Sequence, residues 1–149
     1  MDWSHYRFRS VWNLPAPPAA VYAVLAAPDD YPCWWPQVRE AVRLDERRGR
    51  MRVRSVLPYD LRVTVTARRE DPDARVLEVE LGGDLQGWAR WTVAADGAHA
   101  TRAVYEQEVD VRRPLLRRLA VPARPFFRVN HALMMRAGRR ALAARLAGA

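Results

Sequence analysis

The sequence of 149 residues contains one cysteine, Cys33, and three histidines, His5, His99 and His131. A single cysteine excludes an intramolecular disulfide and a cysteine-based metal cluster. The histidines are scattered and show no metal-ligand spacing, so we expect no metal ion. Glycine-rich phosphate loops, nucleophile elbows and dinucleotide fingerprints are also missing, so we expect no cofactor.

Long apolar runs are absent as well. No stretch approaches the roughly 18 apolar residues that suggest a membrane-spanning helix. The first residues, Met1–Tyr6, have neither the basic start nor the apolar centre of a secretory signal peptide. These features predict a cytoplasmic protein.

Lysine and isoleucine are absent, and all 25 basic side chains are arginines. The formal charge of +8 would suit nucleic acid, anionic lipid or an acidic partner. However, the arginines are spread along the whole chain, often at alternate positions such as Arg50, Arg52 and Arg54. That spacing is typical of a solvated strand face, and no nucleic-acid-reading motif accompanies it. We therefore expect no nucleic-acid partner.

What the sequence does contain is enough apolar material for one core. Half of the residues are hydrophobic, and the length suits one domain over 1–149. Trp3–Leu14 alternates, with Tyr6, Phe8 and Trp12 on one side, and predicts a half-buried strand.

Two short helical segments should follow the first strand. Ala19–Ala27 is predicted as a helix that Pro28–Pro32 ends, and Cys33–Pro36 as a second helical turn with one or both tryptophans buried. Alternating periodicity then predicts six more short strands joined by tight turns. The expected strands are Val38–Leu44, Arg50–Leu57, Leu61–Arg68, Arg75–Leu81, Leu85–Ala94 and Arg102–Val111. The segment Gly82–Asp84 is expected to break the fourth of these.

The last third of the chain predicts a long amphipathic helix, Pro125–Leu146. Its apolar face is formed by Phe127, His131, Met134, Met135, Gly138, Leu142 and Leu146. The antiparallel sheet has one apolar face, and this helix is the only long element available to cover it. The fold class is therefore α+β. Gly138 should mark close packing or leave room for a ligand, and we favour close packing.

Several segments resemble the START-related, birch-pollen-allergen-like superfamily, and in particular its bacterial polyketide cyclase/dehydrase-like branch. They are Trp12–Leu25, Tyr31–Val38, Gly87–Trp91, Thr101–Glu106 and Asn130–Gly138. The resemblance implies a helix-grip fold, in which a seven-stranded curved antiparallel sheet wraps a long C-terminal helix. It also implies a cavity between them for lipids, sterols, quinones or polyketides. Because members include carriers, sensors, chaperones and a few cyclases, it leaves the function open.

His131 is the most informative candidate, because the apolar face directs it toward the sheet. It would bind a ligand carbonyl or act as a general base, or it is a core histidine with a satisfied imidazole. No carboxylate lies at helical spacing from it, so catalysis is the weaker interpretation, with His131 and Tyr105 as its candidates. The expected ligand-binding set is Tyr59, Trp91, Tyr105, Gln107, Phe127, Asn130, His131, Met134 and Met135. A polar cluster of His131, Tyr105 and Gln107, closed on itself, is the alternative.

Three functions remain open at this point. The first is non-catalytic binding of a small hydrophobic or aromatic ligand by a monomer or homodimer. The second is a polyketide aromatase/cyclase-type enzyme. The third is a quinone or lipid chaperone that contacts anionic membrane through Arg112, Arg113, Arg117, Arg118 and Arg124.

Overall fold

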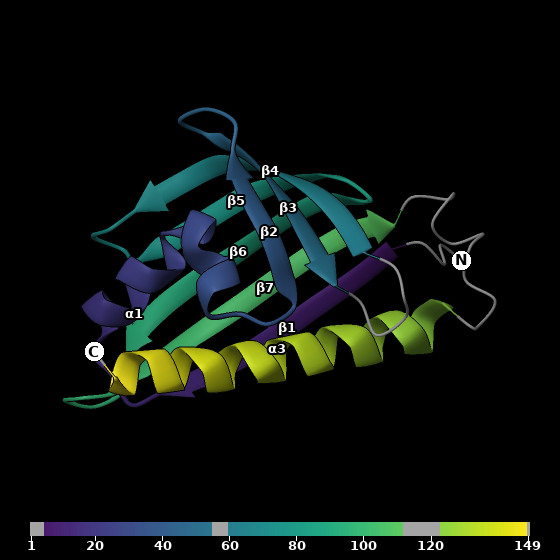
Figure 1. Cartoon of the computed structure of the whole chain (residues 1–149). Helices are drawn as coiled ribbons and strands as arrows, with labels where there is room; N and C mark the ends of the chain where they lie inside the picture. Colours follow the sequence, from purple (N-terminus) through teal and green to yellow (C-terminus); the bar gives the residue numbers. More distant parts are fainter. Residues whose placement is uncertain (1–4, 55–59, 112–122, 149) are drawn as a thin grey trace.

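The computed structural model describes residues 5–54, 60–111 and 123–148. It shows one curved antiparallel sheet with a long helix across its concave face and two short helices at one end (Figure 1). The strands are β1 (His5–Leu14), β2 (Val38–Arg43), β3 (Arg48–Arg54), β4 (Asp60–Asp71), β5 (Val76–Gly83), β6 (Leu85–Ala95) and β7 (Thr101–Val111). The helices are α1 (Pro18–Leu25), the 3₁₀ helix η1 (Pro28–Cys33) and α3 (Ala123–Ala147).

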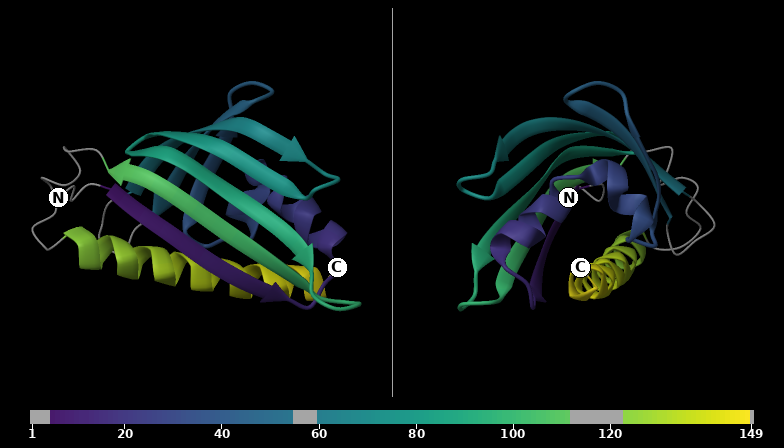
Figure 2. Two further views of the ribbon diagram at one scale, coloured as in Figure 1. Left: turned by 180° about the vertical axis from the view of Figure 1, so that it is seen from behind. Right: turned by 60° about the vertical axis from the view of Figure 1, so that its left-hand side comes forward.

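The sheet has seven strands in the order β1-β7-β6-β5-β4-β3-β2. Strands β2 to β7 form the predicted meander, and β1 completes the sheet by pairing with β7. In the second view of Figure 2 the sheet curves around α3. This confirms the predicted α+β helix-grip fold. No described helix is both long and apolar enough to cross a membrane.

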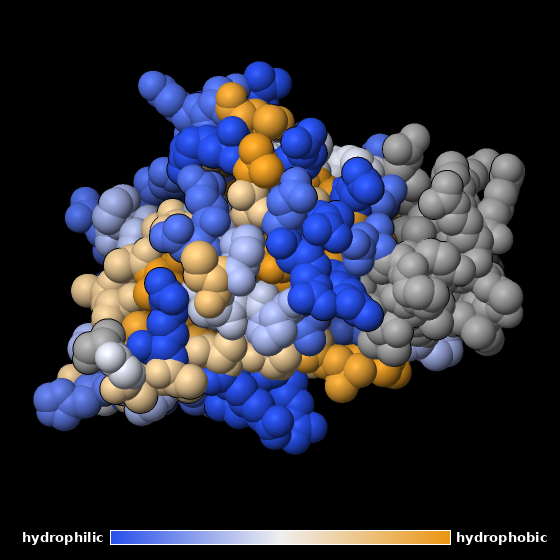
Figure 3. Space-filling view, in the orientation of Figure 1, coloured by the Kyte–Doolittle hydropathy of each residue, from blue (hydrophilic) through white to orange (hydrophobic). Residues whose placement is uncertain are grey.

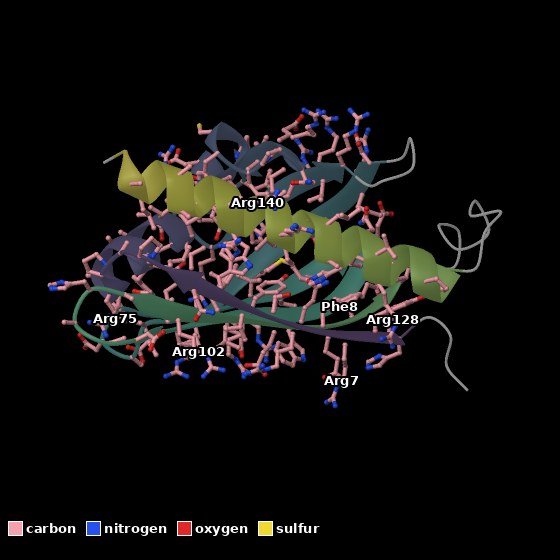
Figure 4. The ribbon with its side chains drawn as sticks, turned by 90° about the horizontal axis from the view of Figure 1, so that it is seen from below. Arg7, Phe8, Arg75, Arg102, Arg128 and Arg140 are labelled. Atoms are coloured by element: carbon pink, nitrogen blue, oxygen red, sulfur yellow. The ribbon has the colours of Figure 1, made fainter. Side chains whose placement is uncertain are left out.

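The alternation seen in the sequence separates the two faces of the sheet. On the inner face, Phe8 of β1 pairs with Gln107 of β7, and Trp91 of β6 pairs with Tyr105. On the outer face, Arg7 contacts Glu108 through an ion pair of 3.2 Å. Figure 4 shows Phe8 between β1 and α3, whereas Arg7 extends from the opposite face.

Two clusters of buried side chains lie between the sheet and α3. The first surrounds Trp12, Trp35 and Leu142, toward the C-terminal half of α3. The second surrounds Tyr6 and Phe127, toward the start of α3. The side chains of Met51 and Met134 pack against both clusters. These two methionines therefore mark the boundary between the halves of the core.

Gly138 lies where α3 packs most closely on the first cluster. A Cβ atom at this position would stand 2.5 Å from Cε2 of Trp35 and 2.8 Å from Cη2 of Trp12. Such distances are shorter than van der Waals contact, so only glycine fits without a shift of the indoles. Of the two roles considered for this glycine, close packing is the one observed.

The second helical turn was placed too late in the sequence. The 3₁₀ helix spans Pro28–Cys33 and not Cys33–Pro36. Pro28 stands in its first turn, where a missing N–H costs nothing, and Asp29 and Asp30 follow at the positive end of the helix dipole. The prolines therefore belong to the helical turn and do not merely end α1. Both following tryptophans, Trp34 and Trp35, are buried.

The break at Gly82–Asp84 was placed two residues too early, because β5 includes Gly82 and Gly83 and only Asp84 separates it from β6. A Cβ on Gly82 would meet Oγ1 of Thr64 at 2.5 Å, and one on Gly83 would meet the carbonyl oxygen of Arg62 at 2.6 Å. Gly83 has φ of +85°, a conformation that favours glycine. These glycines therefore let β5 run close beside β4.

Candidate functional site

Two cavities lie between the sheet and α3, and we name them chamber 1 and chamber 2. Chamber 1 has a volume of about 150 Å³ and lies beside α1 and η1, against Tyr31, Trp35 and Trp91. Chamber 2 has a volume of about 130 Å³ and lies toward the N-terminal half of α3. Its walls include Tyr6, Phe8, Gln107, Phe127, Asn130 and His131. Leu81, Tyr105 and Met134 line both chambers.

The aromatic walls of chamber 1 already use their polar atoms. The hydroxyl of Tyr31 donates a hydrogen bond to the carbonyl oxygen of Leu25 at 2.6 Å. The indole Nε1 of Trp35 donates to the carbonyl oxygen of Met134 at 3.0 Å. Burial raises the pKa of Tyr31 far above its ordinary value, so its hydroxyl stays protonated. The inner part of this chamber therefore offers mainly apolar and aromatic contact.

Charged side chains are confined to one side of chamber 1. Arg69, Glu70 and Glu78, from β4 and β5, are among its lining residues. Arg69 and Glu70 are exposed to solvent. Burial raises the pKa of Tyr22 on α1, and the negative charges of Glu70 and Asp71 raise it further. The strand ends facing α1 thus form the charged side of this chamber.

Chamber 2 carries the polar groups predicted from the sequence. Tyr105 donates a hydrogen bond from its hydroxyl to Oε1 of Gln107 at 2.5 Å. Gln107 and Asn130 are both 7 % exposed. Nε2 of His131 is buried and has no hydrogen-bond partner in the part of the chain that the structure describes. A closed cluster of Tyr105, Gln107 and His131 is therefore only half realised, because the imidazole stays outside the hydrogen bond.

The imidazole of His131 lies between two aromatic rings. It stacks on Phe8 with ring centroids 4.0 Å apart and on Tyr105 with centroids 5.9 Å apart. Loss of hydration lowers the pKa of His131 to about 4, so the ring is neutral at pH 7. Burial raises the pKa of Tyr105 far above its ordinary value, which keeps its hydroxyl protonated. The polar groups of chamber 2 therefore present no charge to a ligand at neutral pH.

Eight of the nine predicted site residues are described, and they lie in chamber 1, in chamber 2, between the two chambers or in the core. Trp91 lines chamber 1, Gln107, Phe127, Asn130 and His131 line chamber 2, and Tyr105 and Met134 line both. Met135 lines neither chamber, because the next position along α3 points it into the first core cluster. Tyr59 lies outside the described residues. So do the segment 112–122 and the end of the predicted strand Arg50–Leu57.

Four aromatic wall residues were not included in the predicted set. Tyr6 and Phe8 line chamber 2, and Tyr31 and Trp35 line chamber 1. Tyr6 and Phe8 occupy the same face of β1 as Trp12, so alternation alone indicated that they point toward α3. Nothing in the sequence distinguishes Trp35 from Trp34 as a wall residue.

No metal site is evident in the described ranges 5–54, 60–111 and 123–148. They contain no group of three or more His, Cys, Asp or Glu side chains placed to hold an ion. Several described carboxylates pair with arginines on the surface instead, as the exposed Asp29 does with Arg43 at 2.8 Å.

Solved structures with the same fold are numerous. The Zhui aromatase/cyclase from a Streptomyces species is 18 % identical with a TM-score of 0.81, covering 95 % of this chain and 93 % of that one. A START superfamily protein from Mycobacterium smegmatis is 15 % identical with a TM-score of 0.77, covering 95 % and 97 %. A protein from Thermus thermophilus is 21 % identical with a TM-score of 0.72, covering 93 % and 99 %. At these identities the likeness establishes the fold alone.

Comparison with curated protein sequences gives no match. The family model described as "Polyketide cyclase / dehydrase and lipid transport", by contrast, matches residues 6–147, from the second residue of β1 to the last of α3. The chain therefore belongs to the polyketide cyclase/dehydrase and lipid transport family.

Proposed function

We propose that the protein binds a small, uncharged hydrophobic or aromatic molecule between the sheet and α3, and that it does so without catalysis. One observation carries the proposal: two largely apolar chambers meet at Tyr105 and Met134, and beside this meeting point Nε2 of His131 is buried without a described partner. Ligand sites are commonly apolar cavities with a few polar groups that fix orientation. A hydroxyl or carbonyl on the ligand would complete the hydrogen bonding of His131.

The chemistry of the polar groups favours binding over turnover. A general base works best when its pKa lies near the operating pH. His131, with a pKa of about 4, is a weak base at pH 7, and Tyr105 keeps its proton. Among the described residues that line chamber 2, there is no carboxylate to orient the imidazole. These residues therefore supply hydrogen bonds and aromatic contact, which are what a carrier or sensor needs.

Native mass spectrometry of the protein purified from its own host tests the proposal. We expect a non-covalent adduct that disappears under denaturing conditions. As a defined probe, 4-phenylphenol should bind by isothermal titration calorimetry. Binding should weaken in Ala89→Phe, which fills chamber 1, and persist in Ala132→Phe, on the exposed face of α3. Absence of both the adduct and probe binding would refute the proposed function.

An aromatase/cyclase-type enzyme is the second candidate, and the proximity of His131 and Tyr105 favours it. Their rings stack 5.9 Å apart in one chamber, so both would reach the same ligand. Turnover of a linear poly-β-keto thioester by the wild type, abolished in His131→Ala and in Tyr105→Phe, would establish this function. It would also disprove the non-catalytic role.

Membrane contact is the third candidate, and one surface observation favours it. Val129 and Leu133, one turn apart on α3, are 54 % and 47 % exposed, with the exposed Arg128 and Arg136 beside them. Figure 3 shows hydrophobic surface on the N-terminal half of α3. A helix face of this kind suits an anionic lipid surface. The arginines first proposed for the contact, at 112–118, and the side chain of Arg124 lie outside the described residues.

Vesicle flotation separates this candidate from the others. Vesicles containing phosphatidylglycerol should carry the wild type at low salt and lose it at high salt. The variant Leu133→Asp should not float with them. Equal recovery of both proteins without vesicles is the control, and failure of the wild type to float would eliminate membrane contact.

A further inference from the structure

The wall between the two chambers limits what can occupy them. Chamber 1 measures about 150 Å³ and chamber 2 about 130 Å³. An apolar cavity of roughly 150 Å³ accommodates one benzene ring, whereas sites for larger small molecules begin at roughly 300 Å³. Each chamber alone therefore suits a single ring. A longer ligand must occupy both and pass the shared wall of Leu81, Tyr105 and Met134.

Two of the three wall residues are held in place. Tyr105 is fixed by the hydrogen bond from its hydroxyl to Gln107 and by packing on Trp91, with centroids 4.8 Å apart. Leu81 lies within the sheet, paired with Val65 on one side and Gly87 on the other. The hydrogen bond resists movement of the Tyr105 side chain, and the branched side chain of Leu81 has fewer rotatable bonds than that of a methionine.

Met134 differs from both in its side chain, which is long, unbranched and flexible while its backbone is held. Its carbonyl oxygen accepts the hydrogen bond from Nε1 of Trp35 at 3.0 Å, which fixes this turn of α3 against the segment that follows η1. Its side chain is partly buried and packs against both core clusters without a polar contact of its own. An unbranched thioether with three rotatable bonds changes conformation at low cost. The side chain can therefore swing while the helix stays in place.

We propose that the side chain of Met134 is a gate that decides whether the cavity accepts one elongated ligand or only single rings. The inference rests on the proposed function and specifies the shape of the ligand that the cavity would bind. In the closed position the gate separates the chambers. When it is displaced, an apolar end lies in chamber 1 against Trp35 and Trp91, and an uncharged hydrogen-bonding end lies beside His131.

The direction of the ligand follows from the polar atoms that remain. In the inner part of chamber 1, away from Arg69 and Glu70, the hydroxyl of Tyr31 and Nε1 of Trp35 already have acceptors, so a polar end gains little there. In chamber 2, Nε2 of His131 has no partner within the described residues. Burying a hydroxyl or carbonyl without a hydrogen bond is unfavourable. The matching ligand class is an elongated, mainly apolar molecule with one uncharged hydroxyl or carbonyl at one end.

Two probes that differ by one ring test the gate. Phenol has the size of one chamber, and 4-phenylphenol places a second ring in line with the first. The quantity to measure by calorimetry is the affinity for 4-phenylphenol relative to phenol. Displacing a side chain from its preferred rotamer changes a binding constant by up to about tenfold. We therefore expect Met134→Ala to raise the ratio about tenfold and Met134→Phe to lower it by a similar factor.

Leu133→Ala is the matched control, because Leu133 is exposed on the outer side of α3 and lines neither chamber. The affinity of this variant for 4-phenylphenol relative to phenol should equal that of the wild type. Far-UV circular dichroism should show that each variant is folded; if Met134→Ala is not, the lowered ratio in Met134→Phe decides the question alone.

The possible failures are distinguishable. If both probes bind and the ratio is the same in the wild type and the Met134 variants, the gate is wrong and the proposed function stands. If neither probe binds the wild type or Met134→Ala, the gate is refuted, and the proposed function is refuted with it when native mass spectrometry also finds no adduct.

Discussion

The imidazole of His131 on α3 lies parallel to the ring of Phe8 on β1, with centroids 4.0 Å apart and planes inclined by 10°. This stack joins the long helix to the edge strand that closes the sheet beside β7. The same imidazole lines chamber 2. One face of the His131 ring therefore packs in the core while Nε2 has no partner among the described residues, and under the proposed function this nitrogen would contact the ligand.

Replacing His131 separates these two roles. His131→Phe retains an aromatic ring over Phe8 but removes the nitrogen, so the free energy of unfolding should change by less than about 1 kcal/mol. The affinity for 4-phenylphenol should fall about fivefold, the value of one neutral hydrogen bond. His131→Ala should lose the stack as well and be destabilised by about 2 kcal/mol. Urea unfolding and calorimetry measure both quantities, and unchanged affinity in His131→Phe would exclude contact with the probe.

Acid should destabilise the protein through His131. Its pKa is ordinarily 6.5 and is about 4 in the folded chain, so the unfolded chain takes up the proton first. The stabilisation from the neutral imidazole is therefore complete above pH 6.5 and is lost as the pH falls toward 4. Between pH 7 and 5 the wild type should lose about 2 kcal/mol more than His131→Phe. Equal losses in the two proteins would contradict burial of the imidazole.

His5 should show the opposite pH dependence. Its ring nitrogens contact Asp110 at 3.0 Å and Glu108 at 2.9 Å, and these hydrogen bonds raise the pKa of His5 above 6.5. Stability from this group is complete below pH 6.5 and is lost as the pH rises through the raised value. The ring is 38 % exposed, so solvent screening keeps the effect below about 1 kcal/mol.

Titration of the histidine ring signals by NMR checks both the raised pKa of His5 and the lowered pKa of His131 in one experiment. The signal of His5, assigned through its absence in His5→Asn, should titrate above that of the unfolded protein in urea. The signal of His131 should titrate below it. In concentrated NaCl, about 1 M, the His5 value should return toward that of the unfolded protein, because exposed charge pairs are screened. A His5 value unaffected by salt would contradict this surface ion cluster.

Much of this architecture follows from local patterns in the sequence. Period-two alternation predicted the seven strands, and the spacing from Phe127 to Leu146 predicted α3, because each element buries one face. The inward direction of Tyr105, Gln107 and His131 followed from the same periodicities. The location of η1 did not, because the prolines of 28–32 end a helix as readily as they begin one.

The boundary between the chambers lies beyond any such pattern. Met134 and Met135 are adjacent and chemically identical, yet one lines both chambers and the other is buried beside the tryptophans. The rotation of α3 about its axis decides this difference, and that rotation is fixed by the contacts of Met134 and Gly138 with Trp35. Such contacts join segments about a hundred residues apart, and no local signal encodes them.

Gly138 should therefore reverse the usual effect of a glycine-to-alanine change in a helix. At an unconstrained interior position, alanine stabilises a helix by about 1 kcal/mol relative to glycine. Here the added Cβ would overlap the indoles of Trp35 and Trp12, at 2.5 and 2.8 Å. Overpacking of this kind typically costs about 1–3 kcal/mol. Gly138→Ala should thus lower the free energy of unfolding by up to about 2 kcal/mol once the helix propensity is counted.

Gly148→Ala provides the matched control, since it is the same change directly after the last residue of α3. The nearest atom to a Cβ there is the carbonyl oxygen of Ala144 at 3.6 Å, an ordinary van der Waals contact. Its stability should stay within about 0.5 kcal/mol of the wild type. In Gly138→Ala the tryptophan fluorescence of the folded state should also change, because both indoles must shift. If Gly138→Ala were instead more stable than the wild type, α3 would not rest on Trp12 and Trp35, and the position of Met134 between the chambers would lose its support.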